Sequence, residues 1–95
     1  MDKITEKFNA YLQGLNLSKK TLINYLSDLN HFKVWLIAKI LNLGSSAENL
    51  TECVPFINKN LADEYKTYLI NQNTPEKTIN RRLSTLRRFD KFLLE

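Results

Sequence analysis

Residues 74–93 of the chain read TPEKTINRRLSTLRRFDKFL, a helix-start signal followed by a regular apolar repeat. Thr74 can cap a helix, Pro75 suits the first helical position, and Glu76 favours the positive end of the helix dipole. The apolar residues that follow recur at helical spacing, which predicts a helix over about residues 75–93 with one buried face. That face consists of Ile79, Leu83, Leu86 and Leu93, with Phe89 and Phe92 beside it.

The opposite face of this predicted helix is basic. Successive residues of a helix are rotated by about 100°, so side chains three or four positions apart lie on the same side. On the side away from the apolar residues, a row of polar and basic side chains follows the spacing four, three, four and three. Asp90 falls on the core side. A helix fits the major groove of B-DNA, where arginine can pair with guanine and lysine can hold phosphate. The alternatives are an ordinary solvated face, or binding to a membrane or an acidic partner. The basic row consists of Lys77, Arg81, Ser84, Arg88 and Lys91.

The net charge of the chain is concentrated in the same segment. The formal charge is +4 over 95 residues, and residues 74–95 hold six basic and three acidic side chains. The first 73 residues hold eight basic and seven acidic groups, so they contribute only +1. Positive charge clustered in one segment is typical of proteins that bind a polyanion.

Three further helices are predicted upstream. Gly14 ends the first, Ser18 is the N-cap of the second, and Gly44 supplies its stop. Amphipathic spacing places these helices over about residues 2–13, 18–41 and 58–72. No alternation typical of strands appears. The sequence therefore predicts one all-α domain over residues 1–95, a compact bundle of four main helices.

Residues 42–57 are predicted to be a connection between the second and third helices. Gly44, Ser45 and Ser46 favour a turn, and Pro55 disfavours a helix interior. The apolar residues of this segment are expected to pin it onto the core: Leu50, Val54 and Phe56.

Composition and motifs argue against catalysis. His31 and Cys53 are single residues on different predicted elements, and Asp63 and Glu64 are adjacent, so they point in different directions on a helix. No glycine-rich phosphate loop occurs. No cofactor, metal or small-molecule ligand is expected. No apolar run is long enough to cross a bilayer, and one cysteine cannot form an internal disulfide, so we expect no membrane partner and a cytoplasmic location.

The second predicted helix adds a smaller basic group. Lys20 and Asn24 lie opposite its leucine side, and Lys19 is nearby. Lysines in the first turn are unfavourable for the helix dipole, so a function such as contacting phosphate can explain them. A simple solubilising pair explains them equally well.

The sequence resembles a known family at this point. Residues 78–89, TINRRLSTLRRF, look like the last helix of the core-binding, SAM-like domain of tyrosine recombinases and phage integrases. The second predicted helix is similar to its counterpart in the same family, and the resemblance covers essentially the whole chain. The matching positions there are Ser18, Thr21, Tyr25, Asp28, Leu29 and Phe32.

The resemblance implies double-stranded DNA binding, as the N-terminal clamp module of a site-specific recombinase that carries out DNA integration and recombination. Other recombinase protomers in a synaptic complex would be its protein partners. The family's catalytic residues lie in a second domain absent from this chain, so the fragment is not expected to be an enzyme, although the parent protein would be a tyrosine recombinase. The implied DNA contacts are Lys19, Lys20, Thr21, Asn24, Lys77, Asn80, Arg81, Ser84, Arg87, Arg88 and Lys91.

Several alternatives stay open beside this reading. Ser18 is either a DNA contact or only a helix cap, and Thr78 and Asn80 can instead cap and brace the last helix. Arg82 can pair with an acid such as Asp28. The alternative function is a helical protein-interaction module whose basic face docks on an acidic partner.

Overall fold

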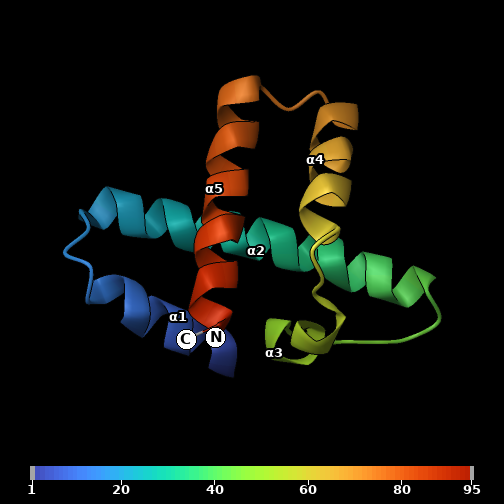
Figure 1. The fold of residues 1–95 in the computed structure, drawn as a ribbon, viewed down its shortest axis with the longest axis horizontal. Helices are drawn as coiled ribbons and strands as arrows, with labels where there is room; N and C mark the ends of the chain where they lie inside the picture. The colour runs from blue at the N-terminus through green and yellow to red at the C-terminus, as the bar shows by residue number, and fades with distance from the viewer. Residues whose placement is uncertain (1, 95) are drawn as a thin grey trace. The chain divides into compact units, whose positions relative to one another are not determined.

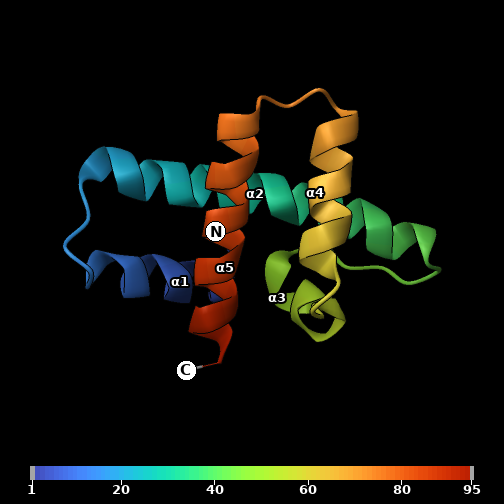
Figure 2. The same cartoon turned by 45° about the horizontal axis from the view of Figure 1, so that its top comes forward.

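The computed structural model describes residues 2–94, and every regular element in that range is helical (Figures 1 and 2). The all-α prediction is therefore confirmed. The chain divides into two units, Met1–Phe56 and Ile57–Glu95. The first unit contains α1 (Lys3–Gln13), α2 (Lys19–Asn42), α3 (Leu50–Cys53) and the 3-10 helix η1 (Val54–Phe56), and the second contains α4 (Leu61–Asn71) and α5 (Glu76–Leu93).

α2 is capped at both ends, and it begins and ends one residue later than the predicted range 18–41. The Ser18 hydroxyl accepts a hydrogen bond from the Thr21 N–H at 3.1 Å, which satisfies one of the N–H groups that a helix start leaves unpaired. At the other end, Gly44 has a φ of +89°, a backbone conformation that favours glycine. The Ser45 and Gly44 N–H groups bond to Ile40 and Leu41 at 3.2 and 3.1 Å, which completes a Schellman motif.

The same motif ends α4 and corrects the predicted start of α5. Asn73 has a φ of +58°, and the N–H groups of Thr74 and Asn73 bond to Leu69 and Ile70 at 3.1 and 3.0 Å. Thr74 therefore belongs to the end of α4, and its predicted role as the cap of α5 is wrong. Pro75 is the N-cap residue, and it makes no side-chain cap hydrogen bond.

The segment predicted as a connection contains regular structure. Residues 50–56 form α3 and η1, and the Asn49 side chain caps α3 by accepting a 3.0 Å hydrogen bond from the Glu52 N–H. Pro55 does not prevent this because it lies beyond the last residue of α3. The third predicted helix correspondingly begins at residue 61 rather than 58.

The anchoring residues of this segment differ in part from the prediction. Leu50 is fully buried, as expected, and Val54 is half-buried. Phe56 is 38% exposed, so the prediction that it anchors the segment is wrong. Cys53 and Ala47, at 0% and 8% exposure, are buried instead.

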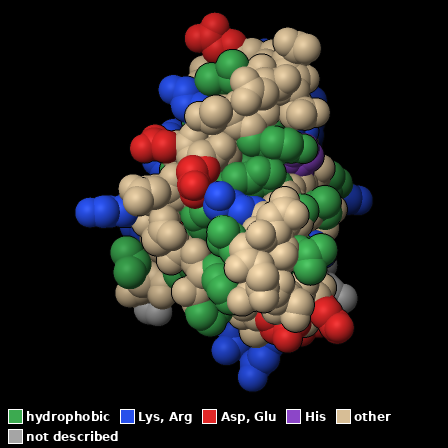
Figure 3. All heavy atoms as spheres, turned by 90° about the vertical axis from the view of Figure 1, so that its right-hand side faces the viewer, with side chains coloured by type: hydrophobic (Ala, Val, Ile, Leu, Met, Phe, Trp, Pro, Cys, Tyr) green, Lys and Arg blue, Asp and Glu red, His purple; other side chains and the backbone are tan. Residues whose placement is uncertain are grey.

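Each unit contributes its own buried side chains. In α2 the buried apolar residues are Leu29, Phe32, Leu36 and Ile40, whereas Leu22 and Leu26 of the predicted apolar side are only half-buried. Hydrophobic side chains also reach the surface between polar ones on the face drawn in Figure 3. The buried apolar residues of α4 and α5 are Leu61, Tyr65, Leu69, Ile79, Leu86 and Phe89.

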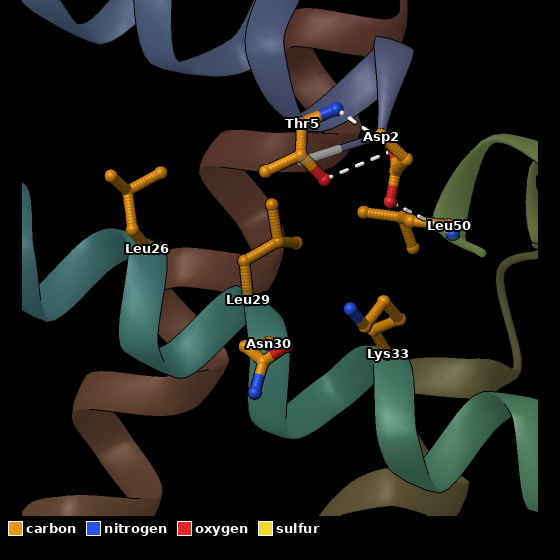
Figure 4. Close-up of a pocket in the computed structure, with 7 residues that line it drawn as sticks. All are labelled: Asp2, Thr5, Leu26, Leu29, Asn30, Lys33 and Leu50. Atoms are coloured by element: carbon orange, nitrogen blue, oxygen red, sulfur yellow. Dashed lines mark hydrogen bonds between the residues drawn. The ribbon is translucent and has the colours of Figure 1, made fainter.

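Asp2 joins the start of α1 to the start of α3. Its Oδ1 accepts hydrogen bonds from the Thr5 N–H and hydroxyl, both at 3.2 Å, and from the Thr51 hydroxyl at 3.1 Å. Its Oδ2 accepts from the Leu50 N–H at 3.2 Å (Figure 4). One carboxylate therefore satisfies a backbone donor at the start of each helix, although Asp2 and Leu50 are 48 residues apart in the sequence.

This double cap predicts a pH-dependent contribution to stability. Partial burial by itself raises the pKa of Asp2. Hydrogen bonds from Thr5, Leu50 and Thr51 lower the pKa by a larger amount, so the net pKa lies below its ordinary value. A group whose pKa is depressed by folding stabilises the protein above the unfolded-state pKa of about 3.9. That stabilisation disappears as the pH falls through the lower folded-state pKa.

Asp2→Ala should therefore lower the free energy of unfolding by about 1–2 kcal/mol at neutral pH, and by less in strong acid. Urea unfolding at the two pH values measures both losses. Glu6→Ala is the matched control, because Glu6 is an exposed acidic residue in the first turn of α1. An equal loss for Asp2→Ala at both pH values would contradict a role for the ionised carboxylate.

Candidate nucleic-acid interface

α5 separates an apolar side from a basic side. Ile79, Leu86 and Phe89 are at most 7% exposed. The predicted DNA contacts of α5 all lie on the rest of its surface, and only Arg88 among these is half-buried. The structure therefore places seven predicted contacts on one 18-residue element, and six of them are exposed: Lys77, Asn80, Arg81, Ser84, Arg87 and Lys91.

A hydrogen bond organises the middle of the basic side. The Arg87 guanidinium donates to the Ser84 hydroxyl at 2.9 Å. The sequence predicted only that Ser84 lies in the basic row of this helix. In the structure its hydroxyl is also the acceptor for the Arg87 guanidinium group. The spacing of three residues, which places side chains next to each other on a helix, was the available signal.

Two polar residues of α5 lie toward its buried side. Thr85 is 3% exposed, and its hydroxyl donates to the Arg81 carbonyl at 3.2 Å, which satisfies a polar group that burial would otherwise destabilise. Asp90 is half-buried, and burial raises the pKa of its carboxyl group. This position agrees with the expectation that Asp90 points away from the basic side, so that no acid interrupts the basic row.

The second group of predicted contacts lies at the start of α2. Lys19, Lys20 and Thr21 are exposed, and Asn24 is half-buried. The Ser18 hydroxyl donates to the Thr21 hydroxyl at 2.8 Å while accepting from the Thr21 N–H. The cap therefore already engages both hydroxyl groups, which leaves the lysines as the stronger candidates for contacting phosphate. This group and the α5 group belong to different units.

Metal and thiol chemistry find no support in the described part of the chain. No cluster of three His, Cys, Asp or Glu side chains that could hold a metal occurs among residues 2–94. Cys53 is buried, and burial, followed by the charges of Glu52 and Asp2, raises the pKa of its thiol despite an opposing effect of Lys33. A thiol of this kind is a poor nucleophile. Within the same residues, no helix combines the length and apolar character needed to cross a bilayer.

Comparisons with known proteins cover the parts of the chain that contain both the α2 and the α5 residues. Residues 5–95 match the family model described as "Phage integrase, N-terminal SAM-like domain". A protein named tyrosine recombinase XerC, from Syntrophus aciditrophicus (strain SB), is 34% identical over 94 residues. That alignment covers 98% of this chain but 29% of the relative, so the chain spans less than a third of the relative's length. No solved structure matches the chain with statistical significance.

Proposed function

The chain belongs to the family of phage-integrase N-terminal SAM-like domains, and on that premise we propose that it binds double-stranded DNA as the N-terminal module of a tyrosine site-specific recombinase. The observation that supports this most directly is the basic side of α5, with six exposed polar or cationic side chains on one helix. An α-helix of this kind has the right width for the major groove of B-DNA.

The residues divide by the contacts that they are proposed to make. Lys77 and Lys91 of α5, with Lys19 and Lys20 of α2, carry compact point charges suited to phosphate. Arg81, Arg87 and Arg88 carry planar guanidinium groups, which can pair with the edge of a guanine. Asn80, Ser84, Thr21 and Asn24 complete the proposed contact set.

The setting of the module follows from the same premise. Other recombinase protomers are its proposed protein partners in a synaptic complex, and the cytoplasm is its proposed location. Cleavage and joining of DNA are assigned in this proposal to the remainder of the recombinase rather than to residues 2–94.

The salt dependence of DNA binding tests this proposal. If the four lysines each neutralise one phosphate, the logarithm of the affinity should fall with the logarithm of the salt concentration at a slope of about −3.6. Fluorescence anisotropy with a labelled duplex, selected by the chain from a random pool, measures the slope. The double variant Lys19→Gln/Lys20→Gln should reduce its magnitude by about 1.8.

A slope near zero, or binding of an acidic protein in preference to the duplex, would contradict the proposal and favour the protein-interaction alternative. Chemical-shift mapping separates these outcomes further. DNA binding should shift signals of the first turns of α2 and the exposed side of α5, and it should leave signals of α4 unchanged.

A further inference from the structure

An exposed isoleucine stands among the proposed DNA contacts at the start of α2. Ile23 is 55% exposed, although isoleucine is one of the residues most often found inside proteins. It follows Lys19 and Lys20 by four and three residues, and it precedes Ser27 by four. Helix residues at this spacing are neighbours, so the four side chains share one side of α2, and all four are exposed. One large apolar side chain is therefore flanked by cationic and polar ones.

Position distinguishes Ile23 from the other exposed apolar side chains, because single apolar residues are ordinary on protein surfaces. Val34 and Leu41 lie on the same side of α2 and are 60% and 65% exposed. They follow Ile23 by 11 and 18 residues, however, and so lie beyond every proposed contact of α2. Among the described residues of α5, Glu76–Leu93, no large apolar side chain is exposed. Ile23 is therefore the exposed large apolar side chain within the two proposed contact groups.

A DNA duplex offers few apolar groups to such a side chain. Its phosphates are charged, and the base edges in the major groove present mainly hydrogen-bond donors and acceptors. The exception is the 5-methyl group of thymine, which apolar side chains can contact there. Lysine is longer than isoleucine, so Lys19 and Lys20 can reach phosphates at the edge of the groove while Ile23, one turn further along α2, lies against the bases.

From these observations, and resting on the proposed function, we infer that Ile23 contacts the 5-methyl group of a thymine and thereby selects thymine at one position of the DNA target. Phosphate contacts such as those proposed for Lys19 and Lys20 are the same at every base pair, so they position the protein without reading sequence. Removing one methyl group from water strengthens binding about fourfold (~0.8 kcal/mol). The start of α2 thus contributes to sequence selection as well as to affinity.

Replacement of thymine by deoxyuridine tests this contact, because deoxyuridine keeps the hydrogen-bonding groups of thymidine and lacks only the 5-methyl group. Each thymine of the selected duplex is replaced in turn, and fluorescence anisotropy at one salt concentration measures the affinity of the 95-residue chain. We expect one replacement to weaken binding about fourfold. Ile23→Ala should bind the unmodified duplex at least about fourfold more weakly, and the same replacement should not weaken binding of this variant further.

Ile70→Ala is the matched control for this substitution. It deletes the same atoms from an isoleucine that is 53% exposed on α4, where no DNA contact is proposed. This variant should keep the affinity of the unmodified chain and its full sensitivity to deoxyuridine. If every replacement weakens Ile23→Ala as much as the unmodified chain, the inference is overturned, while salt-dependent binding by both proteins leaves the proposed function standing. Absence of duplex binding by the unmodified chain would overturn both.

A second measurement does not depend on the folding of a variant. The unmodified chain is labelled with ¹³C at its isoleucine methyl groups and bound to the selected duplex. We expect a nuclear Overhauser contact between a methyl group of Ile23 and the methyl group of the thymine whose replacement weakens binding. A bound complex in which Ile23 shows no contact to any thymine methyl group would overturn the inference.

Discussion

Phe32→Ala is expected to lower the free energy of unfolding by about 3–5 kcal/mol, because it removes a large buried ring and leaves a cavity that the surroundings fill only in part. Phe32 is 2% exposed, and its ring lies 5.8 Å from that of Trp35, centroid to centroid. Domains of this size are typically stable by about 5–14 kcal/mol, so the loss is a large share of the total. Urea unfolding followed by far-UV circular dichroism measures it without relying on Trp35 fluorescence, which the substitution would alter directly.

Phe56→Ala provides a matched control for this experiment. It deletes the same atoms from the same unit, but Phe56 is 38% exposed, so the expected loss is below about 2 kcal/mol. The sequence pattern had grouped Phe56 with the buried residues, and the structure reverses that assignment. Equal losses for the two variants would show that the burial of these phenylalanines is assigned wrongly.

The features that could be predicted from the sequence are those with local causes. A helix of three or more turns repeats its apolar spacing several times, as α2 and α5 do, and the repeat can be recognised without knowing what the helix packs against. Ser18 and Gly44 act on backbone groups a few residues away, so their capping roles also follow from the sequence. The exposed side of α5 is predictable for the same reason.

The features that could not be predicted depend on distant parts of the chain. α3 has four residues and η1 has three, too few to show an apolar repeat. The start of α3 is bonded to Asp2, which is 48 residues away from Leu50. The capping role of Asp2 at the start of α1 could be predicted, because an aspartate directly before a helix is a common N-cap, but its hydrogen bond to the start of α3 could not.

The side-chain arrangement on α5 lies between these two cases. The helix period predicts which residues share a side, but not which of them bond to each other. Ser84 and Arg87 are three residues apart, which permits their hydrogen bond, yet Lys77 and Asn80 have the same spacing and a possible donor and acceptor, and they form none. The choice of partner depends on side-chain rotamers and on what the neighbouring helices leave exposed.

Charge reversal on α5 should have the largest effect on DNA binding. The double variant Arg81→Glu/Arg87→Glu removes two proposed contacts and places two carboxylates on the side of the helix that is proposed to face the duplex. At about 1–3 kcal/mol for each contact, the affinity should fall at least about 30-fold. The fold should be retained because both positions are exposed, and a carboxylate at position 87 lies four residues before Lys91.

The decisive comparison is with Lys3→Glu/Lys7→Glu, which reverses two exposed lysines of α1. Both double variants lower the formal net charge of the chain from +4 to zero, so long-range attraction to DNA falls by a similar amount in each. Only the α5 variant removes proposed contacts, and the control should therefore lose affinity only a few-fold. Anisotropy titrations at one fixed salt concentration measure both. If the control loses as much affinity as the α5 variant, the overall charge of the chain, and not the basic side of α5, determines binding.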